Sequence, residues 1–259
     1  MDSKVRTGQE AGVLTLTICR PEVRNALDYE TKDLLSKGLR HAAQSEDVRV
    51  VVIEGEGVAF SSGEDLKSHQ GEGERSIGKS LREGLNPLVT RMRRLPKPII
   101  AKIQGVAAGA GFSLALAADL RLGSEKARFF SAFTKIGLIP DSGMNQTLPR
   151  IVGLGRAYEI AVTGRVVEAE EALQAGILNR LVPEADLDAE VARVAAELAA
   201  GPTYAFGMTK LAMDRGFDLA LEDLLAWEAD AQEAAGRTRD HREGVAAFFE
   251  KRPPTFGGS

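Results

Sequence analysis

Two glycine-rich segments of the 259-residue chain have the composition of loops that present backbone N–H groups to a ligand. They are residues 60–66 (FSSGEDL) and residues 105–112 (GVAAGAGF). Two preorganised N–H donors aimed at one carbonyl oxygen form an oxyanion hole, which stabilises the charge that develops on that oxygen. The second segment opens a predicted helix, so the positive end of the helix dipole would strengthen a donor at Ala110. The two segments predict chemistry at an acyl thioester.

Asp141 is the candidate proton carrier for such a reaction. Phe133, Leu138 and Ile139 are near it in the sequence, and apolar surroundings would raise the pKa of its carboxyl group. A carboxyl group with a raised pKa can both take a proton and return it. The alternative interpretation is structural, because Asp141 precedes a predicted helix and aspartate is a favoured N-cap residue.

Two glycine patterns resemble nucleotide-binding motifs without their context. Residues 73–80 (GERSIGKS) fit the P-loop pattern, but the polar residues 67–72 cannot form the buried strand that a P-loop follows. Residues 105–111 lack the glycine spacing of a dinucleotide-binding turn, and close helix packing is another use for small residues there. Nucleotide binding is therefore not predicted.

The remaining reactive side chains form no recognisable site. The histidines at 41, 69 and 241 lack metal-ligand spacing, so no metal is expected. The serines at 61, 62 and 142 have no identifiable base, which argues against a serine hydrolase.

The composition indicates a globular protein of the cytoplasm. The chain has 44% hydrophobic and 27% charged residues and a formal net charge of −4, with no basic stripe that would bind nucleic acid. Cys19 is the one cysteine, which rules out an intrachain disulfide and fits a reducing compartment. The N-terminus lacks the apolar core of a signal peptide, and no apolar run is long enough to cross a membrane.

Hydrophobic periodicity predicts an α/β body followed by helices. The strands expected in the body are 13–18, 50–53, 98–103 and 120–122, and its helices are 31–43, 80–94 and 109–118. Residues 67–82 are expected to form a mobile loop that covers a site. Six helices are predicted after Pro149, at 155–163, 167–175, 187–200, 203–214, 219–235 and 239–250. The break at Gly201-Pro202 divides the prediction into a core, 1–200, and a helical region, 201–259.

Four segments resemble, in order and spacing, those of the crotonase, or enoyl-CoA hydratase/isomerase, superfamily. They are residues 20–27 (RPEVRNAL), 60–66, 105–112 and 137–143 (GLIPDSG), and residues 240–253 are similar to the family's C-terminal end. The resemblance implies a spiral of ββα units that binds acyl-CoA, with a helical C-terminal trimerisation region. It also implies a homotrimer or a dimer of trimers, and no cofactor other than the coenzyme A of the substrate.

The resemblance also assigns roles to single residues. The oxyanion donors would be the backbone N–H groups of Glu64 and Ala110. The other matching positions would line the substrate or its coenzyme A, and they are Arg24, Ala26, Ser62, Asp65, Leu66, Phe133, Pro140 and Lys251. Of these, Lys251 would reach coenzyme A bound by a neighbouring subunit.

The resemblance favours an isomerase over a hydratase. The two glutamates of the usual hydratase correspond to Ser113 and Phe133, neither of which carries protons. Asp141 corresponds to an aspartate of several isomerases, and residues 131–143 are most similar to the ring 1,2-epoxyphenylacetyl-CoA isomerases of phenylacetate degradation. The expected substrate is therefore an epoxyphenylacetyl-CoA or a 3-enoyl-CoA. A hydratase, a dienoyl-CoA isomerase and a non-catalytic CoA-binding protein are the alternatives.

Overall fold

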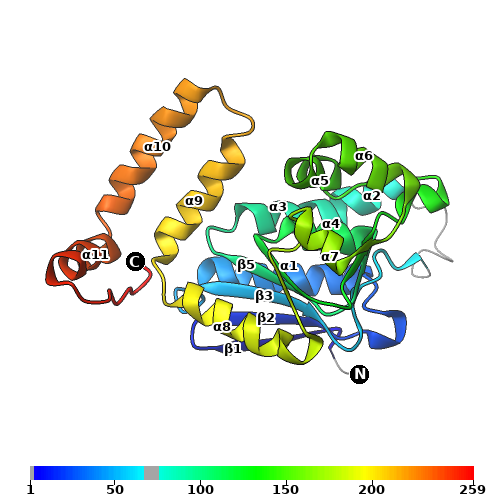
Figure 1. The fold of residues 1–259 in the computed structure, drawn as a ribbon, viewed down its shortest axis with the longest axis horizontal. Helices are drawn as coiled ribbons and strands as arrows, with labels where there is room; N and C mark the ends of the chain where they lie inside the picture. The colour runs from blue at the N-terminus through cyan, green and yellow to red at the C-terminus, as the bar shows by residue number, and fades with distance from the viewer. Residues whose placement is uncertain (1–2, 67–75) are drawn as a thin grey trace.

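Two sheets build the body of the protein, for which the computed structural model describes residues 3–66 and 76–259 (Figure 1). The larger sheet has the order β1-β2-β3-β5-β7-β10 and is parallel except for the β1-β2 hairpin. Its strands are β1 (Val5–Glu10), β2 (Val13–Ile18), β3 (Val50–Gly55), β5 (Ile99–Ile103), β7 (Leu120–Ser124) and β10 (Arg180–Val182). The smaller sheet has the order β4-β6-β8-β9, with strands β4 (Ala59–Ser61), β6 (Val106–Ala108), β8 (Arg128–Phe130) and β9 (Val167–Glu168).

The chain alternates between the two sheets. Strands β3, β5 and β7 lie in the larger sheet, and each is followed by a strand of the smaller sheet, namely β4, β6 and β8. Helices then return the chain to the larger sheet after β4 and β6. This repetition is the predicted spiral of ββα units.

Helices cover both faces of the larger sheet. The helices of the body are α1 (Tyr29–Gln44), α2 (Ile77–Ser80), α3 (Asn86–Arg94), α4 (Ala110–Ala117), α5 (Met144–Val152), α6 (Leu154–Thr163), α7 (Ala169–Gln174) and α8 (Leu187–Ala199). Side chains alternate across β3: Val51 and Ile53 belong to the main core with α1, whereas Val50 and Val52 pack with α8. Both sets are buried, which explains the uninterrupted apolar run of this strand.

Helix α4 lies at the centre of the body, and all eight of its residues are buried. A helix that is apolar on every side belongs in an interior. Gly111 allows it to approach β4 closely, because a Cβ atom there would lie 2.4 Å from the carbonyl oxygen of Ser61. The small residues predicted to pack closely therefore do so, and they place the start of α4 beside the end of β4.

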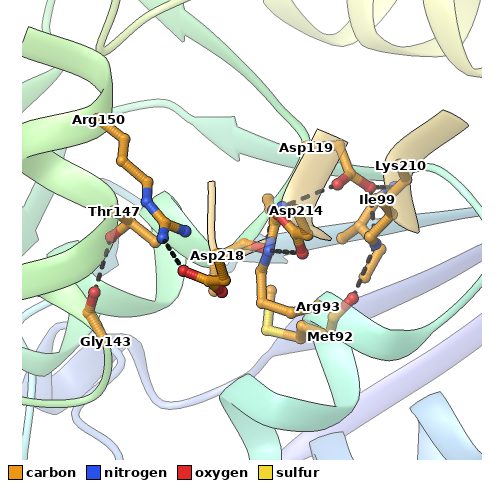
Figure 2. A network of polar contacts seen from close by, with 12 residues as sticks. Met92, Arg93, Ile99, Asp119, Gly143, Thr147, Arg150, Lys210, Asp214 and Asp218 are labelled. Carbon is orange, nitrogen blue, oxygen red and sulfur yellow. Dashed lines mark hydrogen bonds and ion pairs between the residues drawn. The ribbon is translucent and has the colours of Figure 1, made fainter. Parts of the chain in front are cut away.

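The C-terminal helices α9 (Thr203–Arg215), α10 (Leu221–Gly236) and α11 (Arg239–Glu250) follow the body. Figure 1 shows α10 and α11 standing away from the two sheets. Helix α9 is tied to the body through a polar network, which Figure 2 shows. Lys210 donates to the carbonyl oxygen of Met92 at 2.7 Å and to Asp119 at 2.9 Å, and Arg93 forms an ion pair with Asp214. The division at residue 200 stays a prediction.

Several predicted elements differ from the structure. The short strands β1, β4, β6, β8, β9 and β10 were not predicted as separate strands, and the helix predicted over 167–175 begins as strand β9. The helix predicted at 80–94 starts three residues earlier and contains a π-helical turn at Leu81–Leu85. The predicted mobile loop falls largely on residues 67–75, outside the described residues, as does the first part of the P-loop-like pattern. Over the residues that the structure describes, no helix is both long and apolar enough to span a membrane.

Candidate active site

The two glycine-rich segments meet at one edge of the smaller sheet. Strands β4 and β6 are parallel neighbours, with Ser61 beside Ala107, so their carboxyl ends lie together. Gly63 has a φ of +98°, and a Cβ atom on it would lie 2.7 Å from the carbonyl oxygen of Ala108 and 3.2 Å from the nitrogen of Ala110. Only glycine tolerates that conformation and that approach. The backbone of residues 63–64 therefore lies against the beginning of α4.

Ala110 is the first residue of α4. The hydrogen bonds of this helix begin with the N–H of Ser113, which donates to the carbonyl oxygen of Gly109 at 3.0 Å. The N–H of Ala110 therefore has no acceptor within its own helix. It adds a donor at the positive end of the helix dipole, beside residues 63–64.

A strained loop joins the predicted CoA-binding residues. Arg24 and Asn25 have φ angles of 54° and 58°, in the left-handed region. The fully buried side chain of Asn25 holds this shape, because it accepts from the N–H of Arg20 and donates to the carbonyl oxygen of Ala59. The N–H of Ser62 donates to the carbonyl oxygen of Arg24 at 2.8 Å. Arg24 and Ser62, predicted from separate motifs, are thus neighbours.

The other predicted residues near this loop differ in exposure. Ala26 is buried, while the side chain of Leu66 is 56% exposed. Asp65 is buried, and its carboxylate accepts from Arg20 at 2.8 Å. Arg20 also donates to the carbonyl oxygen of Ala26. The carboxylate of Asp65 thus helps to hold the loop in place, a role that the sequence did not reveal.

Asp141 lies in a tight turn before α5, and its side chain does not cap that helix. The N-cap residue is Gly143, without a capping side chain, and Oδ1 of Asp141 instead accepts from the hydroxyl of Ser142 at 2.8 Å. The N-cap interpretation of Asp141 was therefore wrong. Ser113 donates its hydroxyl to the backbone oxygen of Asp141 at 3.0 Å. This bond connects the Asp141 turn to α4, one helical turn after Ala110.

The surroundings of Asp141 favour its protonated form. Burial raises the pKa of its carboxyl group most, the hydroxyl of Ser142 lowers it, the charge of Glu64 raises it and the ammonium of Lys32 lowers it, with a net increase. Phe133 is buried, but Ile139 is 76% exposed and contributes little to this desolvation. The oxyanion segment and Asp141 are therefore within electrostatic reach of each other.

Pro140 lies at the Asp141 turn, whereas Lys251 lies away from the other predicted residues. Pro140 is buried next to Asp141, and its carbonyl oxygen accepts from the amide of Asn145 at 2.5 Å. Lys251 is exposed at the end of α11, on the helices that stand apart from the body in Figure 1. The single chain does not bring Lys251 to the other predicted residues. Contact with coenzyme A in a neighbouring subunit stays a prediction.

The sequence and the fold both match one family of known proteins. The profile of the enoyl-CoA hydratase/isomerase family matches residues 8–259. The chain belongs to this family. Its α/β architecture is the crotonase fold, and the structure of an enoyl-CoA hydratase from Bacillus anthracis superposes with a TM-score of 0.93 at 31% identity, covering 99% of this chain and 100% of that one.

Similar members of the family have different names. A probable enoyl-CoA hydratase of Rhodobacter capsulatus is 42% identical over 95% of each chain. A 1,2-epoxyphenylacetyl-CoA isomerase of Escherichia coli is 38% identical over 96% of each chain. As a member of this family, the chain is a crotonase-fold protein that acts on acyl-CoA, as a hydratase or an isomerase.

Proposed function

We propose that this chain is an acyl-CoA isomerase whose proton carrier is Asp141. The observation that carries the proposal is the position of Asp141, which is partly buried, free of a capping role and linked through Ser113 to the helix of the oxyanion donor. The positions that hold glutamates in the usual hydratase are Ser113 and Phe133. The hydroxyl of Ser113 instead holds the backbone of Asp141.

The proposed reaction moves one proton within the acyl group. With a 3-enoyl-CoA, the carboxylate of Asp141 takes a proton from C2, and the electron pair of that bond moves towards the thioester oxygen. The N–H groups of Glu64 and Ala110 stabilise the resulting enolate. The carboxyl group then returns the proton to C4, which leaves the double bond between C2 and C3. With an epoxyphenylacetyl-CoA, the same polarisation would open the epoxide and expand the ring to an oxepin.

Five of the proposed binding residues lie in the strained loop or in the segment that follows β4. Arg24 would pair with a phosphate of coenzyme A, and Ala26, Ser62, Asp65 and Leu66 would line the rest of that ligand. Phe133 and Pro140 would bound the acyl pocket. Lys251 would act from a neighbouring subunit of a trimer or a dimer of trimers, and the proposed location is the cytoplasm.

The test compares wild type with Asp141→Asn on crotonyl-CoA, a 3-enoyl-CoA and the phenylacetyl-CoA epoxide. We expect isomerisation by the wild type and a loss of about 10²- to 10⁴-fold in kcat for the variant, the usual contribution of a general acid–base group. Asp47→Asn, in an exposed loop, is the control and should keep full activity.

Other outcomes identify the alternatives. Hydration of crotonyl-CoA as the main reaction would favour the hydratase, which the Rhodobacter relative supports. Full activity of Asp141→Asn would remove the proposed mechanism. Binding of CoA thioesters without turnover would favour a non-catalytic CoA-binding protein.

A further inference from the structure

A partly buried ion pair lies directly beside the proposed oxyanion hole. Nζ of Lys32, on α1, lies 2.6 Å from Oε1 of Glu64, and the Lys32 side chain is only 3% exposed. Burial of an ammonium group is costly unless a negative charge compensates it. Glu64 supplies that charge, and its backbone N–H is the proposed oxyanion donor. The ion pair with Lys32 therefore holds the side chain of Glu64 and, with it, the backbone of the same residue.

One helical segment contacts both this pair and the turn of Asp141. At Gly84, in the π-helical turn, a Cβ atom would lie 3.4 Å from the side chain of Lys32. The segment continues as α3, where Val89 would lie 3.5 Å from a Cβ atom on Gly143. Irregular π-helical turns occur often at functional sites. The helical segment 81–94 therefore lies against both the ion pair and the Asp141 turn.

We propose that Lys32 and Glu64 form a positioning pair, which holds the N–H of residue 64 in place and balances the charge next to Asp141. This inference rests on the proposed function. The charged side chains whose fields act on Asp141, among the described residues, are Glu64 from the loop after β4 and Lys32 from α1. The family resemblance assigns no proton-carrying role to Lys32 or to the side chain of Glu64.

The pair matters because the reaction generates negative charge nearby. The thioester oxygen becomes an enolate while the Asp141 carboxylate is neutralised by the proton it takes. The carboxylate of Glu64 alone would repel that enolate, and the ammonium of Lys32 offsets the repulsion. The two members also shift the pKa of Asp141 in opposite directions, because the charge of Glu64 raises it and the charge of Lys32 lowers it.

The test uses the pH dependence of kcat/KM in Glu64→Gln, Lys32→Met and the double variant. Ionised Asp141 is the active base, so activity falls as the pH drops through its pKa. Glu64→Gln removes a charge that raises this pKa, and the acidic limb should move to lower pH. Lys32→Met removes a charge that lowers it, and the limb should move to higher pH. Each shift should be up to about 1 pH unit, at the low end of the effect of a nearby charge.

The double variant should place the acidic limb between those of the two single variants. It also guards against misfolding, because replacing both members of a buried pair leaves no uncompensated charge. Lys102→Met is the matched control, since Lys102 forms a partly buried pair with Glu54 at 2.9 Å within the larger sheet. The free energy of unfolding of Lys102→Met should differ from that of wild type, while the acidic limb of its pH profile stays in place.

The results separate this inference from the proposed function. If Asp141→Asn is inactive but the acidic limb is the same in all three variants, the pair has no such role and the isomerase proposal stands. A limb that moves in the reverse order would also overturn the inference. If Asp141→Asn keeps its activity, the proposed function itself is wrong.

Discussion

At the scale of single residues, Asp141 is placed for chemistry at the expense of stability. Its pKa in the folded protein lies above the ordinary value of 3.8, mainly because of burial. The stability that Asp141 contributes is therefore fully present below pH 3.8 and is lost as the pH rises through the higher folded-state pKa. We predict that Asp141→Asn, which keeps the acceptor for the Ser142 hydroxyl, unfolds at a higher urea concentration than wild type at neutral pH.

The same measurement at a pH below 3.8 provides the control, because both proteins then carry a neutral side chain at position 141 and the difference should disappear. A variant that is less stable than wild type at neutral pH would contradict the prediction. Agreement would show a conflict between stability and activity at this residue.

The sequence marked the glycine-rich segments of the candidate site but not the residues that support them. Glycine spacing indicated the segments around Glu64 and Ala110, and the structure brings these segments close together at Gly63 and Gly111. The contacts of Asn25 with Ala59 and of Lys32 with Glu64 gave no local signal, because they join residues 34 and 32 positions apart in the chain. Contacts of this kind follow from the fold and not from a pattern of neighbouring residues.

At the scale of elements, Asp28 fixes the beginning of α1, the helix that carries Lys32. Its Oδ1 accepts from the N–H of Thr31 at 2.8 Å, and its Oδ2 forms an ion pair with Lys4 at 2.7 Å. Burial alone would raise the pKa of Asp28, but the hydrogen bonds from Lys4 and Thr31 outweigh it and hold the pKa at about 2. We predict that Asp28→Ala lowers the free energy of unfolding by about 1–2 kcal/mol, as the loss of an N-cap does.

Urea titrations at several pH values check this prediction. The contribution of the Asp28 charge is present above pH 3.8 and is lost as the pH falls through about 2. The difference between wild type and Asp28→Ala should therefore narrow in acid. A difference that is independent of pH would mean that the carboxylate charge plays no part.

Lys210 is one of the side chains that attach helix α9 to the body. Its ammonium group is buried, and burial lowers the pKa of Lys210 despite the charge of Asp119. We predict that Lys210→Met destabilises the protein by about 1–3 kcal/mol, because the carbonyl oxygen of Met92 loses its buried donor. Thermal unfolding measures the loss, and Lys37→Met, in an exposed pair, is the control that should change little.

Helices and strands were predictable where they are long enough for their hydrophobic pattern to be recognised. Continuous apolar runs marked the strands around Val50 and Ile99, and helical spacing marked α1, and these elements begin and end within two residues of the predicted bounds. Strand β1 has one buried residue among six, so it lacks the alternation that marks a strand. The strands of the smaller sheet have two or three residues each, too few to show a period.

At the scale of the whole molecule, the C-terminal helices expose apolar side chains that a partner subunit would cover. No residue of α10 is buried, and Phe248 and Phe249 of α11 are 79% and 77% exposed. Monomeric proteins rarely leave such a surface in water. We predict a mass of about three or six times 27.7 kDa in solution, by sedimentation equilibrium. A mass of 27.7 kDa would contradict the trimer.

Assembly and substrate binding are coupled in this proposal, since Lys251 follows the two phenylalanines. Changing both Phe248 and Phe249 to serine should break the assembly and raise KM. The control is Val58→Ser, at an exposed apolar residue of the body, which should leave both the assembly and KM unchanged. Lys251→Met should leave the mass unchanged and raise KM about tenfold, the equivalent of one charged hydrogen bond. If KM rises when the assembly breaks but not in Lys251→Met, the C-terminal helices shape the site by another contact. If neither change affects KM, each subunit binds coenzyme A by itself.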